Sequence, residues 1–403
     1  MREHLVIAGG GQAATQTAQS ARQAGFQGAV TLVAAEPHLP YQRPPLSKSF
    51  LAGDLERSRL FLKPEQFFES REIELALDTR VEQIDPAQKR VSLSGGHVLD
   101  YSHLLLALGS EPRKLEVPGH DLDGIYCLRT IGDAESIRQA LGGAERLLVV
   151  GAGYIGLEVA AVAAKDGRQV TVLEAGSHAM SRSVCPEVAD FFVDRHRQAG
   201  VDIRFNARLT AFLGDAAVEG VETENGDRFE CDLAIVAIGI LPCVGIAESA
   251  GLAIDDGISV DPGCRTSAPG IFAAGDCTSH THPWVGRRVR LESVQNAIEQ
   301  GKTAAASICG QEAAFDAIPW FWSDQYDLKL QIAGLSSGFD QVVFRGRPDD
   351  GSFSVFYLES GRLIAVDSVN DPRTFIAARK FLAGKPSWPA GVIADTDCDL
   401  SGL

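Results

Sequence analysis

Two glycine-rich turns with the same surroundings decide how this chain folds. They read Gly9-Gly10-Gly11-Gln12-Ala13-Ala14 and Gly151-Ala152-Gly153-Tyr154-Ile155-Gly156. Each follows an apolar run, at 5–8 and at 147–150, so each predicts a strand that turns into a helix. In this pattern the first glycine permits the turn, the second admits a pyrophosphate and the third small residue packs the helix on the strand. The sequence therefore predicts two βαβ dinucleotide-binding units.

Each turn is followed by a second strand-like run that closes on an acid. The runs cover 29–33 and 169–173, and the acids are Glu36 and Glu174. Such an acid hydrogen-bonds a ribose 2′-hydroxyl and repels a 2′-phosphate, so Glu174 favours NADH over NADPH. Arg182 leaves this preference open, because it is near enough in sequence to offset part of the repulsion. Its other interpretation is a cation for the NADH pyrophosphate or for solvent.

The two copies also end alike. Residues 104–112, which include Ala107 and Gly109, are echoed by 234–242, which include Ile238 and Gly239. Both stretches predict a buried strand that leaves through a crossover containing glycine and proline. We therefore expect the second unit to be inserted into the first. The expected domains are 1–110 with 241–312, then 111–240, and finally 313–403.

The last predicted domain has a different pattern. Short alternating stretches such as 353–358 predict strands, and the run 372–382 predicts a helix. The expected fold class is α/β, with two Rossmann-type dinucleotide-binding domains and a sheet-rich C-terminal α+β domain.

Composition excludes several classes of protein. The chain has 403 residues, a formal charge of −16 and an apolar fraction of 45%. The negative charge argues against nucleic-acid and membrane partners, and no stretch reaches the ~20 apolar residues of a membrane span. Eight scattered cysteines suggest neither a disulfide framework nor a metal site. With no export signal visible at the N-terminus, we expect a soluble, cytoplasmic protein.

Four further segments carry a family resemblance. They are 40–48, 266–276, 292–297 and 321–326. Together with the glycine turns, they resemble the oxygenase-coupled, NADH-dependent ferredoxin reductases, the putidaredoxin reductase-like group of the FAD-dependent pyridine nucleotide-disulfide oxidoreductases. The resemblance spans essentially the whole chain. It implies a glutathione reductase-like fold, with FAD in the first domain, NADH in the second and an interface domain at the C-terminus.

The resemblance also implies which residues contact the cofactors. For FAD they are Gly9, Gly11, Ala14, Glu36, Arg43, Lys48, Val81, Ala107, Gly109, Arg129, Asp276, Val294 and Trp322, and for the nicotinamide and the flavin edge they are Glu292 and Ser293. For NADH they are Gly151, Gly153, Tyr154, Ile155, Gly156, Glu158, Glu174, Arg182, Ile238 and Gly239. Ser293 has a second interpretation as a helix N-cap. Leu108 departs from the family, which usually carries threonine there, and so removes one hydroxyl.

Three residues are the candidates for catalysis. The resemblance implies that Lys48 lies beside flavin N5, where a cation stabilises the charge of reduced flavin. Glu158, one turn into the second dinucleotide helix, can face the nicotinamide. Trp322 is the candidate for the route by which electrons leave. The alternatives are a surface lysine, a solvated glutamate and a packing tryptophan.

The sequence also narrows the reaction. The segment 40–48 lacks the cysteine that related peroxidases carry, no paired cysteine motif is present, and Cys277 is expected to be an inert packing residue. We therefore expect an NADH:ferredoxin oxidoreductase that serves a [2Fe-2S] ferredoxin and, through it, a monooxygenase or Rieske-type dioxygenase. We expect a monomer or weak dimer. The alternatives are a rubredoxin or nitrite-reductase-type NADH reductase and an apoptosis-inducing-factor-like redox-sensing flavoprotein.

An acidic ferredoxin needs positive charge where it docks. The cations nearest the motifs in sequence are Arg287, Arg288, Arg290 and Lys329. They predict a local basic rim, and a solvated charge run is an equal interpretation of them.

Overall fold

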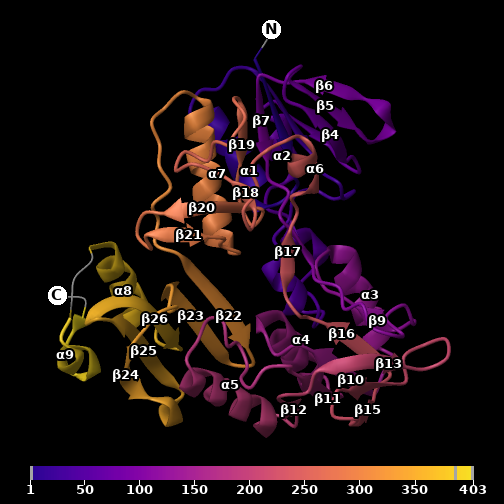
Figure 1. Cartoon of the computed structure of the whole chain (residues 1–403), viewed down its shortest axis with the longest axis vertical. Helices are drawn as coiled ribbons and strands as arrows, with labels where there is room; N and C mark the ends of the chain where they lie inside the picture. The colour runs from indigo at the N-terminus through magenta and orange to yellow at the C-terminus, as the bar shows by residue number, and fades with distance from the viewer. Residues whose placement is uncertain (1–2, 385–387, 401–403) are drawn as a thin grey trace. The chain divides into compact units, whose positions relative to one another are not determined.

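Two five-stranded parallel sheets carry the two glycine turns (Figure 1). The computed structural model describes residues 3–384 and 388–400. The chain forms two units. Unit 1 comprises Met1–Gln42, Arg57–Glu111 and Leu241–Trp320, and unit 2 comprises Arg43–Glu56, Pro112–Ile240 and Phe321–Leu403.

The sheet of unit 1 has the strand order β19-β7-β1-β2-β3, and every neighbouring pair is parallel. Its strands are β1 (His4–Ala8), β2 (Ala29–Val33), β3 (Ile73–Ala76), β7 (His103–Leu106) and β19 (Ile271–Ala273). Residues 5–8 of β1 are all buried, as expected for a parallel strand that is covered on both faces.

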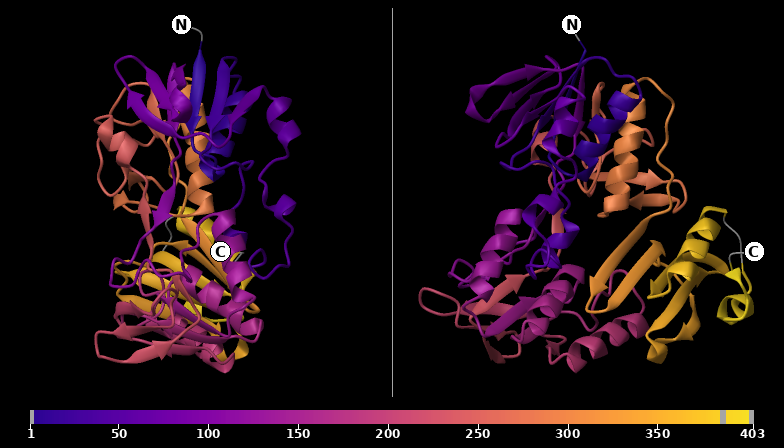
Figure 2. Two further views of the ribbon diagram at one scale, coloured as in Figure 1. Left: turned by 90° about the vertical axis from the view of Figure 1, so that its right-hand side faces the viewer. Right: turned by 180° about the vertical axis from the view of Figure 1, so that it is seen from behind.

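Two helices lie side by side in unit 1, α1 (Gln12–Gln23) and α7 (Val294–Ile308) (Figure 2). Their backbones approach closely at Gly301, where an added Cβ would lie 2.9 Å from the Ala13 carbonyl oxygen. Thr17 Oγ1 donates a hydrogen bond of 3.1 Å to the Gly301 carbonyl oxygen. The small residues of α1 therefore allow the glycine turn to be held against a second helix.

The remaining elements of unit 1 are short. Two further three-stranded sheets contain β4 (Val81–Asp85), β5 (Arg90–Leu93) and β6 (Val98–Asp100), and β18 (Ile258–Ser259), β20 (Thr278–His282) and β21 (Arg287–Val289). The helices are α2 (Glu65–Glu69), α6 (Gly245–Ser249), η2 (Arg57–Leu60) and η3 (Ser94–Gly96).

The sheet of unit 2 has the order β12-β11-β10-β16-β9, with all neighbours parallel, and its four strands β12-β11-β10-β16 correspond to β3-β2-β1-β7 of unit 1. Its strands are β9 (Ile125–Tyr126), β10 (Arg146–Val150), β11 (Gln169–Leu173), β12 (Asp202–Arg204) and β16 (Leu233–Val236). Its helices are η1 (Pro44–Ser47), α3 (Ile131–Leu141), α4 (Tyr154–Lys165) and α5 (Pro186–Gln198). An antiparallel sheet contains β13 (Leu209–Leu213), β14 (Gly220–Thr223) and β15 (Arg228–Glu230). The duplication in the sequence is therefore a duplication of sheets.

A five-stranded sheet ends unit 2, in the order β22-β23-β26-β25-β24. Its elements are β22 (Trp320–Gln325), β23 (Leu328–Gly334), β24 (Gln341–Arg347), β25 (Ser352–Glu359), β26 (Arg362–Val369), η4 (Pro348–Asp350), α8 (Pro372–Gly384) and α9 (Ala390–Ala394). The chain changes unit at β8 (Ser110–Pro112) and β17 (Ile240–Pro242), which pair with each other. The predicted fold class is confirmed, and the predicted domain boundaries stay a prediction.

The strand predicted at 353–358 is confirmed. These residues form β25, but all six are buried. Phe353 and Phe356 point to opposite faces, and both faces are covered. The Phe353 ring lies 5.0 Å from Phe191 of α5, and the Phe356 ring lies 6.4 Å from Trp388.

No helix among the described residues combines the length and apolar character needed to cross a membrane.

Candidate dinucleotide and hydride-transfer sites

The first glycine of each turn is pressed against the end of a neighbouring strand. Gly9 has φ +138°, and an added Cβ would lie 2.1 Å from the Ala107 carbonyl oxygen. Gly151 has φ +104°, and its Cβ would lie 2.5 Å from the Ala237 carbonyl oxygen. Neither backbone has room for a side chain, so both turns require glycine. Ala107, a residue of the predicted crossover, therefore lies directly against the first glycine turn.

The second glycines leave open space. Gly11 and Gly153 are the N-cap residues of α1 and α4, and neither helix has a capping side chain or an acid in its first turn. A Cβ added at either glycine would meet no atom within 4 Å. Exposed backbone N–H groups and the positive end of the helix dipole favour an anion there. The residues thus fit the pyrophosphates of two dinucleotides, one in each unit.

The third small residues pack the helices down. Ala14 is fully buried. A Cβ on Gly156 would lie 2.1 Å from the Gly151 carbonyl oxygen, so this turn is tighter than the first. Tyr154 and Ile155 lie between the second and third glycines of this turn. The Tyr154 ring lies 4.8 Å from the Phe321 ring, and Ile155 is 38% exposed.

The two predicted ribose-binding acids have different partners. Glu36 accepts a hydrogen bond of 2.7 Å from the Tyr41 hydroxyl. Glu174 accepts hydrogen bonds of 2.8 Å from the Ala152 N–H and of 2.7 Å from the Gly176 N–H. Because Ala152 belongs to the glycine turn, the Glu174 carboxylate is held directly beside it.

Arg182 lies in unit 2, near Gly239 and Tyr154. The nearest atom to a Cβ added at Gly239 is Nη2 of Arg182, at 3.8 Å. The Arg182 charge also acts on the Tyr154 hydroxyl. The guanidinium therefore lies by the crossover that contains Ile238 and by the start of α4. This position fits the interpretation of Arg182 as a cation for the pyrophosphate.

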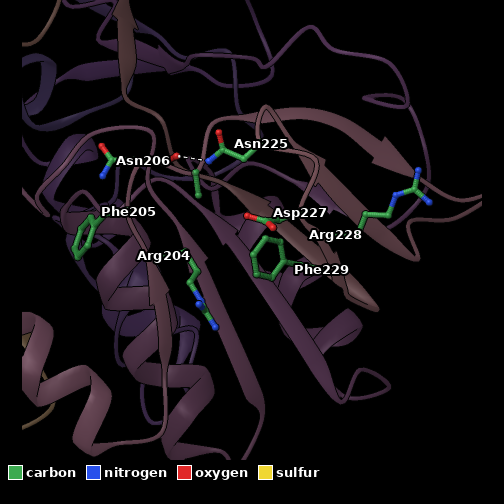
Figure 3. A pocket seen from close by; sticks show the side chains of 8 residues that line it. Arg204, Phe205, Asn206, Asn225, Asp227, Arg228 and Phe229 are labelled. Atoms are coloured by element: carbon green, nitrogen blue, oxygen red, sulfur yellow. Dashed lines mark hydrogen bonds between the residues drawn. The ribbon is translucent and has the colours of Figure 1, made fainter.

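Figure 3 shows a pocket of about 390 Å³, and two of its lining residues hydrogen-bond the backbone of Glu174. It is lined by Arg204, Phe205, Asn206, Ala207, Asn225, Asp227, Arg228 and Phe229. The Glu174 N–H donates to the Arg204 carbonyl oxygen at 2.8 Å, and the Ala207 N–H donates to the Glu174 carbonyl oxygen at 2.9 Å. The Asn225 amide donates to the Asn206 carbonyl oxygen, which joins the end of β12 to the β14–β15 turn (Figure 3).

Asp276 lies beside the first crossover. It follows β19 by three residues, and Ser110 donates to its carboxylate at 3.1 Å. Gly109 in the same crossover has φ +68°, a conformation that favours glycine. Leu108 packs against the core of unit 1, and Val81 is half-buried at the start of β4. This protein therefore lacks the threonine hydroxyl that the family usually has at this position, and Leu108 makes an apolar contact instead.

Cys277 is inaccessible. Its side chain is fully buried, and burial raises the pKa of the thiol to about 12. A neutral, buried thiol is a poor nucleophile, which agrees with a packing role.

Arg43 and Arg129 are brought together in unit 2. Arg43 Nη1 donates to the Arg129 carbonyl oxygen at 2.6 Å. Arg129 stands just before α3, whose N-cap Thr130 forms a capping box with Asp133. The cap fixes the backbone that Arg43 contacts.

The residues at the start of α7 have partners of their own. Ser293 is the N-cap and accepts a hydrogen bond of 3.1 Å from the Asn296 N–H, directly before Val294. The N-cap interpretation of Ser293 therefore holds. Glu292 pairs with Arg290.

The predicted basic rim is largely neutralised. Arg288 lies 3.0 Å from Asp255, and Arg290 lies 3.2 Å from Asp256 and also pairs with Glu292. Lys329 lies 3.7 Å from Asp324. Acidic neighbours thus pair with three of the four cations, and the part of these residues in docking stays a prediction.

Lys48 and Glu158 form a buried ion pair in unit 2. Lys48 Nζ lies 2.8 Å from Glu158 Oε2, and the Glu158 side chain is only 3% exposed. The Ser47 hydroxyl donates to Oε2 at 2.5 Å, and the Ser323 hydroxyl donates to Oε1 at 2.6 Å. Three donors thus converge on one carboxylate, and the alternative of a solvated glutamate is wrong.

Trp322 and Ser323 are on different faces of β22. Ser323 and Gln325 are buried, whereas Trp322 and Asp324 are half-buried. Sequence reasoning singled out Trp322 and missed Ser47, Ser323 and Gln325. The period of two in Phe-Trp-Ser-Asp-Gln was the available signal, because it separates the serine and glutamine from the tryptophan.

Comparisons with known proteins cover the whole chain. A family model described as pyridine nucleotide-disulphide oxidoreductase matches residues 3–301, and one described as reductase C-terminal matches 320–403. Rhodocoxin reductase of Rhodococcus erythropolis is 44% identical over 98% of this chain and 93% of its own length. The ferredoxin–NAD(+) reductase component of an anthranilate 1,2-dioxygenase system from Burkholderia cepacia is 41% identical over 94% of both chains. The solved structure of the ferredoxin reductase for the CYP199A2 system of Rhodopseudomonas palustris matches with a TM-score of 0.97, 41% identity and 99% coverage of both chains.

Proposed function

This chain belongs to the pyridine nucleotide-disulphide oxidoreductase family, and from this premise we propose that it is an NADH-dependent ferredoxin reductase. It passes hydride from NADH to FAD and then single electrons to a [2Fe-2S] ferredoxin, which supplies a monooxygenase or a Rieske-type dioxygenase. When bound, FAD supplies the conversion between a two-electron donor and a one-electron acceptor. Relatives that span the chain and are named as reductases of such systems support this proposal.

One observation carries the proposal. The helices α1 and α4 both begin at a glycine with open space and with no capping side chain. The chain therefore presents two sites for dinucleotide phosphates, as a reductase that holds both FAD and NADH requires. We assign FAD to the α1 site and NADH to the α4 site.

The chain's own residues divide the work. Glu36 and Asp276 bind hydroxyl groups of FAD, Arg43 and Arg129 bind its phosphate and adenosine edge, and Glu174 binds a ribose of NADH. The pocket beside Glu174 takes the adenosine end of NADH. Supporting this, the Glu174 carboxylate and the open N-terminus of α4 are joined through the Ala152 N–H.

The Lys48–Glu158 pair serves hydride transfer. We assign Lys48 to flavin N5, where its positive charge would stabilise the negative charge of reduced flavin. Glu158 holds the ammonium in place, because a buried carboxylate with three donors has little freedom to move. Trp322, on the other face of β22, is assigned to the route by which electrons leave.

We also place the protein in the cytoplasm, as a monomer or weak dimer. All eight cysteines lie among the described residues, and none of them forms a disulfide bond. Cysteines without disulfide bonds are typical of proteins kept in reducing compartments.

Anaerobic stopped-flow reduction by NADH tests the proposal. We expect the protein to release FAD on acid precipitation, to bleach rapidly with NADH and then to reduce a [2Fe-2S] ferredoxin. Flavin held in the pellet, FMN in the supernatant, or slow bleaching with a long-lived charge-transfer band would contradict it. The last result would favour a redox-sensing flavoprotein, and reduction of rubredoxin in preference to ferredoxin would favour a rubredoxin reductase.

A further inference from the structure

The carboxylate of Glu158 is the end of a longer buried chain of polar side chains. Ser323, which donates to Glu158 Oε1, in turn accepts from Gln325 Nε2 at 3.2 Å. Gln325 Oε1 lies 2.9 Å from His196 Nε2, and His196 Nδ1 lies 3.1 Å from the Tyr326 hydroxyl. Ser323, Gln325 and His196 are each at most 1% exposed. These hydrogen-bonded side chains thus link α5 to α4 through β22.

The directions of these hydrogen bonds follow from one fixed acceptor. An ionised carboxylate only accepts, so the Ser323 hydroxyl donates to Glu158 and its oxygen is left to accept from Gln325. The Gln325 amide nitrogen therefore faces Ser323 and its oxygen faces His196, which must carry its proton on Nε2. His196 Nδ1 is then the acceptor for the Tyr326 hydroxyl. Every donor points toward Glu158.

His196 suits this arrangement only as a neutral ring. Its side chain is fully buried. Burial lowers the pKa of His196 to about 4, against the opposing effect of the Gln325 hydrogen bond. At neutral pH the ring therefore has one donor and one acceptor nitrogen, and Tyr326 selects between them.

This row of hydrogen-bonded side chains is suited to orienting the Ser323 hydroxyl and not to transporting protons. A proton wire needs groups that accept a proton on one side and release one on the other. Gln325 interrupts such a wire, because its carboxamide has separate donor and acceptor atoms and does not titrate. Its two ends do fix direction: reversing the amide would turn the Ser323 hydroxyl away from Glu158.

We propose that Gln325 and His196 are positioning residues, which hold the Ser323 hydroxyl toward Glu158 and thereby hold the Lys48–Glu158 ion pair in place. The assignment rests on the proposed function, which gives that ion pair its part in hydride transfer. Neither residue needs to touch a cofactor. Each acts through the next side chain along β22 and α4.

A double-mutant cycle between Gln325 and Ser323 tests whether they act as one path. In the FAD-loaded protein, Gln325→Met and Ser323→Ala should each slow NADH-driven flavin bleaching about tenfold, the size of one hydrogen bond to a charged group. The Kd of NADH should change little. The double variant should be no slower than Ser323→Ala alone. Losses that multiply, or no loss in either single variant, would overturn the proposal.

Gln331→Met is the matched control. It makes the same chemical change on β23, and Gln331 is half-buried and faces Ser368 across the sheet. Its bleaching rate should equal that of the wild type. Replacement of His196 adds a test of chemistry against packing: His196→Gln keeps an N–H donor and should retain the rate, whereas His196→Leu should lose it. Equal rates in these two variants would reduce His196 to a packing residue.

A spectroscopic readout does not depend on turnover. In the oxidised wild-type protein with ¹⁵N-labelled histidine, His196 should show a protonated Nε2 and an unprotonated Nδ1. The opposite tautomer requires a reversed Gln325 amide and would overturn the proposal even if every variant failed to fold. If NADH cannot reduce the wild-type protein, the proposed function itself is wrong. Failure of the proposed function can therefore be told apart from failure of the positioning role of Gln325 and His196.

Discussion

Lys48 Nζ lies 2.8 Å from Oε2 of Glu158, and the carboxylate that it contacts is almost fully enclosed. Burying two charges is costly unless they are paired and hydrogen-bonded, and removing one partner leaves the other uncompensated. Ser47 and Ser323 supply the remaining hydrogen bonds. The arrangement therefore holds one ammonium in a defined place.

Removing either member of this pair should slow hydride transfer. We expect Lys48→Ala and Glu158→Ala each to lower the rate of flavin bleaching by NADH by roughly tenfold to a hundredfold, because the ammonium is lost or released. FAD content should stay close to that of the wild type. The double variant should be little worse than either single one. Stopped-flow absorbance measures the rate, with Lys302→Ala in the exposed Lys302–Glu299 pair as control; unchanged rates in both variants would contradict the assignment.

Glu174 should set the preference for NADH over NADPH. The combination of Glu174→Gln with Ser177→Arg removes the negative charge and adds a cation at an exposed neighbouring position. We expect the ratio of kcat/KM for NADH to that for NADPH to fall at least about tenfold, since a 2′-phosphate is no longer repelled. Ser177→Arg alone should move it less. If the wild type uses both nucleotides equally well, Glu174 does not have this part.

Two glycines of the second turn should respond in opposite ways to alanine. Gly153 has an ordinary φ of −80° with open space before it, so Gly153→Ala should fold normally and lose NADH affinity. Gly156→Ala places a methyl group 2.1 Å from a backbone oxygen and should lower the free energy of unfolding by about 1–3 kcal/mol. Thermal unfolding and NADH titration separate these effects. Equal NADH affinity in Gly153→Ala and the wild type would move the pyrophosphate elsewhere.

Asp367 should make stability fall as pH rises. Burial raises the pKa of this carboxyl to about 8, while Tyr357 donates to it. A raised pKa means that the folded state holds a proton that the unfolded state, with a pKa of about 3.9, releases. The contribution of Asp367 to the free energy of unfolding is therefore complete below pH ~4 and decreases as the pH rises to ~8. The free energy changes by at most about 1.4 kcal/mol per pH unit.

Asp367→Asn should remove this dependence. Denaturant unfolding at several pH values measures it, and the variant should gain stability relative to the wild type as pH rises from about 5 to about 8. Effects of the other titrating groups, such as His280 with its pKa lowered to about 4 by burial, cancel in the difference. A difference that stays constant with pH would show that Asp367 is ionised in the folded protein.

Trp322 should matter more for a protein acceptor than for a small one. Trp322→Ala is expected to lower the rate of ferredoxin reduction several-fold more than the rate of ferricyanide reduction, because ferricyanide does not need a defined docking surface. Steady-state assays with both acceptors measure this. Equal losses would show that Trp322 holds β22 in place. Charge reversal at Arg288 or Arg290 is not a clean test of docking, because it breaks the ion pairs with Asp255 and Asp256.

Much of the cofactor architecture could be predicted from the sequence. The glycine turns depend on a few consecutive residues, and each requirement is local: Gly9 and Gly151 have positive φ, and Gly11 and Gly153 begin helices. The acid Glu174 follows directly after its strand for the same reason. Short-range patterns of this kind constrain the backbone whatever else surrounds them.

Which side chains meet was decided by the tertiary structure. Nothing in the sequence near Glu158 shows that Ser47 and Ser323 complete its hydrogen bonds, or that His196 stands behind Gln325. The same holds for β25, whose two faces are covered by contacts with α5 and Trp388. The sequence by itself determined two nucleotide-binding turns and the residues that form them. Only the folded chain decided how a buried charge is held, because its partners come from segments whose proximity depends on packing and not on spacing along the chain.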